Sequence, residues 1–314
     1  MSLTLSAEAM LSKRDLAKAD LNVQNIYHLF FKSSASHYSL ILFYELTCKI
    51  YCRYACHVFN EKYSCSTNYN TIQLAGKKAA ISLTFDDARY SQADTGVAFL
   101  NHYGIKATFF VVPSSVEERL NGWKKATASG HEIGNHTITH PCTGNFLWSK
   151  NHALENYNLD SIKNELTKCN EGVEELLGVK PEVFAYPCGQ KFVGRDTNTK
   201  SYVPLISQMF LLGRGWRDEA MNDAAFCDMA QISGIEMDGK NFDEILPLIE
   251  EAKNTGQWLV LAGHEMGDSG VQTTRFAMLK QLIEYVQDPA NEIWIAPAGT
   301  IAKYILKNRK ALVK

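Results

Sequence analysis

The 314-residue chain carries 32 Lys and Arg against 34 Asp and Glu, a formal net charge of −2, with 46% hydrophobic and 21% charged residues. These proportions are close to those of average globular proteins and exclude a collagen-like, linker-like or wholly disordered chain. Because there is no excess of positive charge to neutralise phosphates, nucleic acid is not an expected partner. The length suits two average domains or one large barrel.

The first quarter of the chain differs from the rest in its residue pattern. We therefore divide the sequence into an N-terminal extension, 1–76, and a catalytic domain, 77–314. Residues 1–20 lack the apolar core of a signal peptide and carry several charges. The apolar run 38–59 contains charges at 45, 49 and 53, so it falls short of the roughly 18 uncharged residues of a membrane span. These charges would form one polar stripe of a helix. We therefore expect a helical surface or docking extension, and membrane association is disfavoured.

The chain has eight cysteines, four in the extension and four in the rest: Cys48, Cys52, Cys56, Cys65, Cys142, Cys169, Cys188 and Cys227. The spacing of the first three places them along one stripe of a helix and differs from the C-x2-C pairs of a zinc knuckle. A buried or partly oxidised structural role is therefore expected rather than metal binding.

From residue 77 onward, apolar strand-like runs alternate with helix-like segments. The expected strands are 79–85, 106–112, 131–137, 183–186, 258–264 and 292–297. The expected helices are 91–103, 121–129, 154–177, 273–287 and a terminal helix ending near residue 307. An alternation of about seven strands with helices or loops favours a parallel α/β barrel over an open sheet.

Candidate catalytic groups follow several of these strands, and in a barrel such strand ends share one face. Asp86 and Asp87 end the first strand, and adjacent carboxylates favour one metal ligand beside one group for proton transfer. His136 and His140 are four residues apart, so one helical turn would point both at an ion that Asp87 also binds. His264 follows a later strand. Taken alone, the Asp-Asp pair is explained by a solvated turn and the histidine pair by chance. Because both motifs and His264 each follow an apolar strand, a single shared site is favoured.

The motifs TFDDA at 84–88, HTITH at 136–140 and LVLAGH at 259–264 together resemble those of the NodB-like polysaccharide deacetylases, carbohydrate esterase family four. The resemblance covers about residues 77–305 and implies a distorted, incomplete (β/α)7-type barrel. It also implies one divalent metal, zinc with cobalt or nickel as alternatives, whose bound water is the nucleophile. The implied roles are Asp86 as general base, His264 as general acid, and Asp87, His136 and His140 as metal ligands.

The family's third motif, Arg-x-Pro-Tyr/Phe-Gly, corresponds here to residues 185–189, which read Ala-Tyr-Pro-Cys-Gly. The resemblance implies a substrate- or oxyanion-binding role for Tyr186 and Cys188, the latter through its backbone N–H, which needs no particular side chain. A nucleophilic Cys188 would need a partner base. Ala185 stands where the family has arginine, so no local guanidinium orients Asp86.

The best match to the family's next motif is the segment 214–218, Arg-Gly-Trp-Arg-Asp. Here Trp216 would be a sugar-stacking wall or, alternatively, a core aromatic. Asp218 would orient the acid His264. Arg214 or Arg217 would serve as a substitute for the absent arginine.

Three functions are compatible with these residues. The first is a metal-dependent hydrolase that removes N- or O-acetyl groups from a polysaccharide or oligosaccharide. The second is a catalytically silent carbohydrate-binding protein on the same fold, suggested by the missing arginine. The third is a metal-independent glycosidase with two carboxylates. Acetylated glycans such as chitin, peptidoglycan or xylan suggest an extracellular or periplasmic location, although no clear signal peptide is present.

Overall fold

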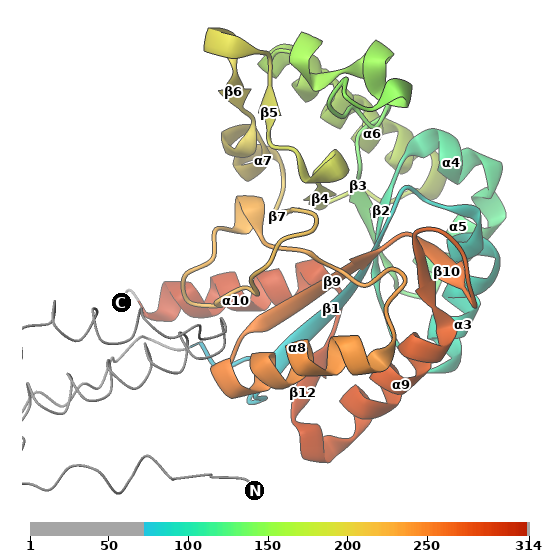
Figure 1. The fold of residues 1–314 in the computed structure, drawn as a ribbon, viewed down its shortest axis with the longest axis vertical. Helices are drawn as coiled ribbons and strands as arrows, with labels where there is room; N and C mark the ends of the chain where they lie inside the picture. The colour runs from blue at the N-terminus through green and yellow to red at the C-terminus, as the bar shows by residue number, and fades with distance from the viewer. Residues whose placement is uncertain (1–71, 313–314) are drawn as a thin grey trace, which may run out of the picture. The chain divides into compact units, whose positions relative to one another are not determined.

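The computed structural model describes residues 72–312, which Figure 1 shows as strands surrounded by helices. The predictions for the helical extension, its cysteines and its membrane association fall on residues 1–71 and so lie outside the described residues. No helix within 72–312 is long and apolar enough to cross a membrane. Ile72 and Leu74 are buried, so the packed core includes residues that precede position 77.

The centre of the domain is an eight-stranded sheet in the order β7-β4-β3-β2-β1-β9-β8, with β12 also paired to β1. All of these pairings are parallel. The strands are β1 Ala79–Asp86, β2 Thr108–Val111, β3 Glu132–Asn135, β4 Val183–Ala185, β7 Leu212–Arg214, β8 Ile235–Glu236, β9 Trp258–Gly263 and β12 Ile293–Ile295. Every residue of β1 is buried, as expected for a strand covered on both faces.

The sheet curls toward a barrel without closing completely. Residues 79–81 of β1 pair with β12, while residues 84–86 pair with β2, so these two neighbours use different halves of the strand. An isolated parallel bridge between Arg214 and Ile232 links β7 to the segment that leads into β8. The predicted α/β fold with a distorted, incomplete barrel is confirmed.

Helices cover the outside of the sheet (Figure 1). They are α3 Val97–His102, α4 Pro113–Glu118, α5 Leu120–Ala128, α6 Leu159–Leu177, α7 Val203–Met209, α8 Phe242–Thr255, α9 Phe276–Gln287 and α10 Ala298–Leu312. The long helix begins at 159 rather than at the predicted 154, because the Asn158 side chain accepts a hydrogen bond from the Ser161 N–H and caps it. The predicted helix 91–103 is divided into a π-helical turn, Gln92–Gly96, and α3.

The elements between residues 190 and 257 were not predicted, and they include α7, β7, β8 and α8. Two short pairs complete the fold: β5 Phe192–Val193 with β6 Lys200–Ser201, and β10 Glu265–Gly267 with β11 Thr273–Arg275. The main core lies between β1, β2 and β9 and the helices around them, with Phe85 stacked on Phe109 at 5.4 Å and Trp123 edge-on to Phe109. This packing fixes the carboxyl ends of the parallel strands along one edge.

Candidate active site

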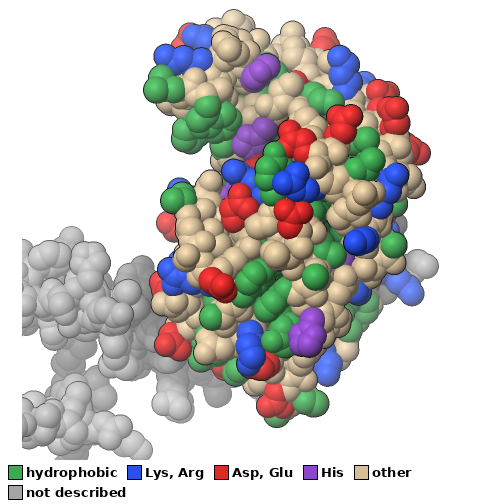
Figure 2. Space-filling view, turned by 90° about the vertical axis from the view of Figure 1, so that its right-hand side faces the viewer, with side chains coloured by type: hydrophobic (Ala, Val, Ile, Leu, Met, Phe, Trp, Pro, Cys, Tyr) green, Lys and Arg blue, Asp and Glu red, His purple; other side chains and the backbone are tan. Residues whose placement is uncertain are grey.

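A pocket of about 1180 Å³ lies at the carboxyl ends of the strands. Its wall includes the five residues of the predicted centre: Asp86, Asp87, His136, His140 and His264. Figure 2 shows one side of the molecule hollowed, with hydrophobic and histidine side chains along the upper border of the hollow. The structure thus brings together residues that are up to 178 positions apart in the sequence.

The carboxylate of Asp87 faces both motif histidines. Its Oδ1 atom lies 3.3 Å from Nε2 of His136 and 3.3 Å from Nε2 of His140. This oxygen is buried and has no hydrogen-bond partner among residues 72–312, while Arg89 binds the other oxygen, Oδ2, at 2.8 Å. His136 Nδ1 lies 2.9 Å from the Ala185 carbonyl, so Nδ1 carries the proton and the Nε2 lone pair points toward Asp87.

These donors fit a divalent metal ion. One carboxylate oxygen and two imidazole nitrogens, all within 4.8 Å of one another, are the ligand types of an open zinc site. Burial raises the pKa of Asp87, but the neighbouring imidazoles of His136, His140 and His264 hold it well below the ordinary value. Burial and the charge of His136 lower the pKa of His140 to about 4. Both groups therefore present lone pairs at neutral pH.

The two histidines converge through a loop, and the expectation that a helical turn aligns them is wrong. Residues 136–140 follow β3 without forming a helix. Thr137 and His140 have φ angles of 64° and 51°, left-handed values that are unfavourable for residues with a Cβ. Glu165 on α6 holds this loop by accepting hydrogen bonds from the backbone N–H groups of Ile138 and Thr139. Such local strain, supported by neighbouring contacts, is typical of functional sites.

Asp86 is 3% exposed and pairs with the fully buried guanidinium of Arg214, whose Nη2 donates to Asp86 Oδ1. Arg214 ends β7, and in the β4·β7 register it lies directly beside Ala185. The guanidinium that is absent at 185 is therefore supplied by the neighbouring strand. Arg217, the other candidate, is exposed and binds Glu236 through two hydrogen bonds of 2.9 Å.

His264 follows β9, and its partner is Asp238. The Nδ1 atom lies 2.7 Å from Asp238 Oδ2, and the His264 backbone N–H donates to Asp238 Oδ1. Burial lowers the pKa of His264, but the Asp238 hydrogen bond and the charges of Asp86 and Asp87 raise it above the ordinary value. The arrangement favours a protonated imidazole whose Nε2–H points into the pocket.

The prediction that Asp218 orients His264 is therefore corrected. The Asp218 carboxylate accepts a hydrogen bond from the Gly234 N–H at 2.9 Å and closes its own loop. Trp216 does line the pocket, and its ring lies edge-on to His264 at 4.7 Å between centroids. Sequence reasoning missed Asp238, because nothing in its local sequence indicates which histidine it will meet.

Tyr186 does not reach the pocket, so the prediction of a substrate-binding role for its side chain is wrong. It is completely buried, donates a hydrogen bond to the Ala230 carbonyl at 2.7 Å and packs against Phe184 and Tyr202. The short 3-10 turn Pro187–Gly189 carries the chain away from β4 toward the pocket. Tyr186 is therefore a core residue at the base of this turn.

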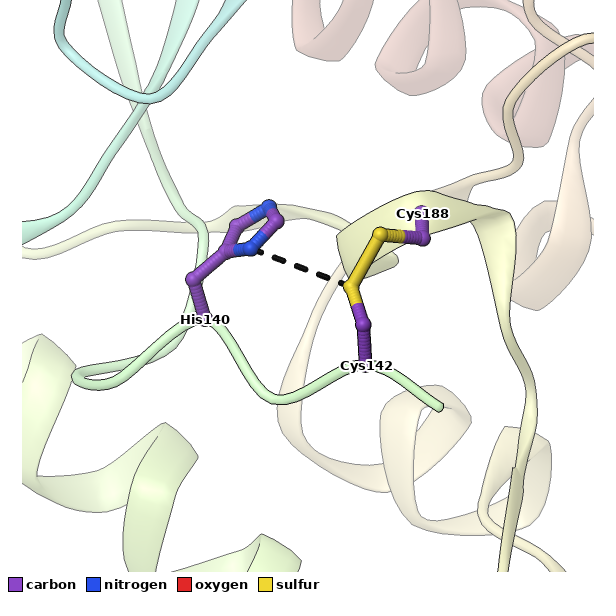
Figure 3. A group of neighbouring side chains, drawn as sticks. All are labelled: His140, Cys142 and Cys188. Atoms are coloured by element: carbon purple, nitrogen blue, oxygen red, sulfur yellow. Dashed lines mark hydrogen bonds between the residues drawn. A yellow bond between two sulfur atoms is a disulfide. The ribbon is translucent and has the colours of Figure 1, made fainter. Parts of the chain in front are cut away.

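Cys188 is joined to Cys142 by a disulfide, shown with the adjacent His140 in Figure 3. The bond excludes a nucleophilic thiol at Cys188, and His140 Nδ1 lies 3.8 Å from Cys142 Sγ. Cys169 is buried and Cys227 half-buried. Of the predicted buried or oxidised cysteines, the structure shows Cys142 and Cys188 oxidised and Cys169 buried.

The backbone of Cys188 has a left-handed φ of 53°, and the residue lines the pocket. Within residues 72–312 its N–H donates to no backbone or side-chain acceptor. The disulfide links the turn to the loop that follows His140. The turn therefore presents a free backbone donor from a position that is fixed covalently.

Comparison with known proteins agrees with this geometry. The profile of the family described as "Polysaccharide deacetylase" matches residues 73–202, which include the Asp86-Asp87 and His136–His140 motifs. A peptidoglycan-N-acetylglucosamine deacetylase of Bacillus cereus is 32% identical over 114 residues, covering 36% of this chain and 38% of that protein. A gellan lyase of a Bacillus species is 24% identical over 245 residues, covering 73% of this chain and 9% of that protein.

Among solved structures, a putative polysaccharide deacetylase from Mycobacterium smegmatis has the same fold. Its TM-score is 0.56 at 17% sequence identity, with 74% of this chain and 92% of that chain covered. The matched parts span less than half the length of the curated relatives. The fold is that of a NodB-like domain. The match over residues 73–202 places the chain in the polysaccharide deacetylase family, whose members are generally metal-dependent hydrolases.

Proposed function

We propose that this pocket hydrolyses N- or O-acetyl groups on a polysaccharide or oligosaccharide. The observation that carries the proposal is the buried, unpartnered Oδ1 of Asp87, which faces two imidazole nitrogens at 3.3 Å. Asp86 and His264 lie in the same pocket, each held by a buried partner of its own. A structural cluster alone would not leave a buried carboxylate oxygen unpaired beside two nitrogen lone pairs.

Asp87, His136 and His140 would hold the divalent metal, for which we propose zinc, although cobalt and nickel suit the same donors. When bound there, such an ion supplies Lewis-acid activation of an acetyl carbonyl and of a water molecule. Arg89, at 2.8 Å from Asp87 Oδ2, orients the carboxylate so that Oδ1 stays turned toward the histidines.

The remaining residues divide the proton transfers between them. Asp86, kept in place by the guanidinium of Arg214, accepts a proton from the attacking water. The Cys188 N–H donates to the oxyanion that forms on the former carbonyl. His264, oriented by Asp238, then donates its proton to the departing amine or alkoxide. In this proposal the Trp216 ring forms the wall against which the reacting sugar packs.

Acetate release from N-acetylglucosamine oligomers and acetylated xylan, measured with and without chelator and after metal add-back, tests the proposal. We expect release to stop with chelator and return with metal. His136→Ala should lose bound metal and activity together. His264→Ala should retain metal but lose turnover, because His264 Nε2 lies 4.0 Å from Asp87 Oδ2 and is not one of the proposed ligands. Activity retained in both variants contradicts the assignment.

The same experiment separates the two alternatives. Stoichiometric metal binding without release from any substrate would favour a catalytically silent carbohydrate-binding protein. Cleavage that does not depend on metal would favour a glycosidase. The missing arginine that suggested a silent protein is supplied from β7, where Arg214 contacts Asp86, and this supports the hydrolase.

A further inference from the structure

Two exposed aromatic side chains stand at the border of the pocket, on the loop that follows His140. The rings of Phe146 and Trp148 are stacked with centroids 5.3 Å apart and an interplanar angle of 21°. Phe146 is 44% exposed and Trp148 59% exposed, and both line the pocket. The Trp148 ring also lies 5.7 Å from that of His140, so this aromatic platform, Phe146 and Trp148, extends directly from the proposed metal centre.

The loop that carries the aromatic platform is held in place before any ligand binds. The Cys142–Cys188 disulfide ties it to the turn that carries the free N–H. Ser149 Oγ accepts from the Cys142 N–H and donates to the Cys142 carbonyl, closing the loop on itself. The Thr143 N–H donates to the Gln190 side chain at 2.7 Å. A platform fixed in this way loses little conformational entropy on binding, which favours a recognition role.

The surroundings of the platform indicate the chemistry of its ligand. Stacked aromatic rings offer flat, electron-rich faces, while the nearby His152 and Gln190 supply polar groups on the same pocket wall. A purely apolar ligand would make no use of the His152 imidazole or of the Gln190 amide NH2, which remains free to donate. A pyranose ring satisfies both, because its axial C–H groups are weakly positive and its hydroxyls lie around the edge.

We propose that Phe146 and Trp148 form a stacking subsite for a second sugar of the glycan, next to the one that reacts at the metal centre. This inference rests on the proposed function for the identity of the polymer. The platform requires a ring face that carries only C–H groups. Pyranoses with all substituents equatorial, such as gluco- and xylo-configured units, offer such a face on both sides of the ring. An axial hydroxyl, as in galacto-configured sugars, blocks one face and leaves the other free to stack.

The test measures binding to the full chain after chelator treatment, by calorimetry, with three probes: the tetramers of N-acetylglucosamine, xylose and N-acetylgalactosamine. We expect the first two to bind at least as tightly as the third, since either of their ring faces can stack. Trp148→Ala and Phe146→Ala should each weaken binding of the preferred tetramers on the order of tenfold. Trp148→Phe should restore most of it, because it keeps an aromatic face.

Phe226→Ala provides the matched control, since this ring is 88% exposed and does not line the pocket. It should bind all three tetramers as the unaltered chain does. The subsite is refuted if Trp148→Ala and Phe146→Ala bind like the control, or if the unaltered chain binds none of the three tetramers.

Hydrolysis of a small aryl acetate by the metal-loaded chain distinguishes failure of the subsite from failure of the proposed function. Phe226→Ala should leave kcat/KM unchanged for both this ester and the preferred tetramer, whereas Trp148→Ala should lower kcat/KM for the tetramer more than for the ester. Normal aryl acetate hydrolysis with unaltered tetramer binding overturns the subsite alone. Platform-dependent tetramer binding without hydrolysis of either substrate overturns the proposed function and leaves the subsite standing.

Discussion

Removal of the Arg214 guanidinium should damage both stability and activity, since it would leave Asp86 buried without a counter-charge. Arg214 is fully buried and Asp86 is 3% exposed, so water cannot replace the lost partner. Arg214→Met keeps the unbranched apolar stem but removes the donors to Asp86 Oδ1 and to the Gly215 carbonyl. Breaking a buried ion pair by removing one member costs about 3–5 kcal/mol.

Urea unfolding of the full chain would measure this loss directly. The total free energy of unfolding of an ordinary domain is about 5–15 kcal/mol. The loss in Arg214→Met should therefore lower the urea midpoint strongly, but the variant should still be folded in buffer. Arg217→Met is the control, because its exposed pair with Glu236 contributes at most about 1 kcal/mol. Acetate release by Arg214→Met should fall even where the variant is fully folded, because the proposed base loses its orientation.

Relocation of the guanidinium provides a sharper version of the experiment. Ala185 and Arg214 are paired across β4 and β7, and neighbouring strands lie about 4.8 Å apart. The double variant Ala185→Arg with Arg214→Ala therefore offers the same charge from the adjacent strand. We expect it to be more active than Arg214→Ala alone. The reasoning is refuted if Arg214→Met unfolds and turns over like the unaltered chain, or if the relocated arginine restores nothing.

Other predictions concern groups around the pocket. Tyr186→Phe should lower the free energy of unfolding, measured in urea, by about 1–3 kcal/mol, because the Ala230 carbonyl loses its buried donor. The KM for glycan should not change, and a raised KM would contradict a core role. Replacing both Cys142 and Cys188 by Ser should lower stability by about 2–4 kcal/mol, since the bond closes a loop over a separation of 46 residues; unchanged calorimetric unfolding would contradict it. Burial and a nearby lysine lower the pKa of His131 to about 4 from 6.5, so its contribution to stability is complete above pH 6.5 and is lost as the pH falls toward 4. Removing this titration with His131→Gln should flatten the pH dependence of unfolding by up to about 3 kcal/mol between those values, and an unchanged slope would contradict it.

The long apolar strands and their terminal motifs could be predicted from sequence because both signals are local. Residues 79–85 and 258–264 are continuous buried runs of the kind that parallel sheets require. The region from 190 to 257 was harder, because β7 and β8 have only three and two residues and owe their pairing to distant strands. Helix α8 did carry readable signals, namely the Asn241–Glu244 capping box and the terminal Gly256.

The disulfide illustrates a different limit. Eight cysteines allow 105 complete pairings, and spacing does not choose among them. Cys142 and Cys188 meet because β3 and β4 are neighbours in the sheet, so the segments that leave their carboxyl ends run side by side. The same neighbourhood places the aromatic platform beside the proposed metal centre. Only the strand order carries this information.

Asp218 and Arg214 show why the roles in this site follow from place in the sheet rather than from position in a motif. Asp218 lies within the matching motif, but its carboxylate accepts a hydrogen bond from the Gly234 N–H. Asp238, twenty residues later, is the residue that contacts His264. Arg214 reaches Asp86 because β7 lies against β4, which ends at the motif position that lacks an arginine. A parallel sheet brings several strand ends to one edge, so a required charge can come from any strand within reach. The absence of one motif side chain is therefore weak evidence that such a site is inactive.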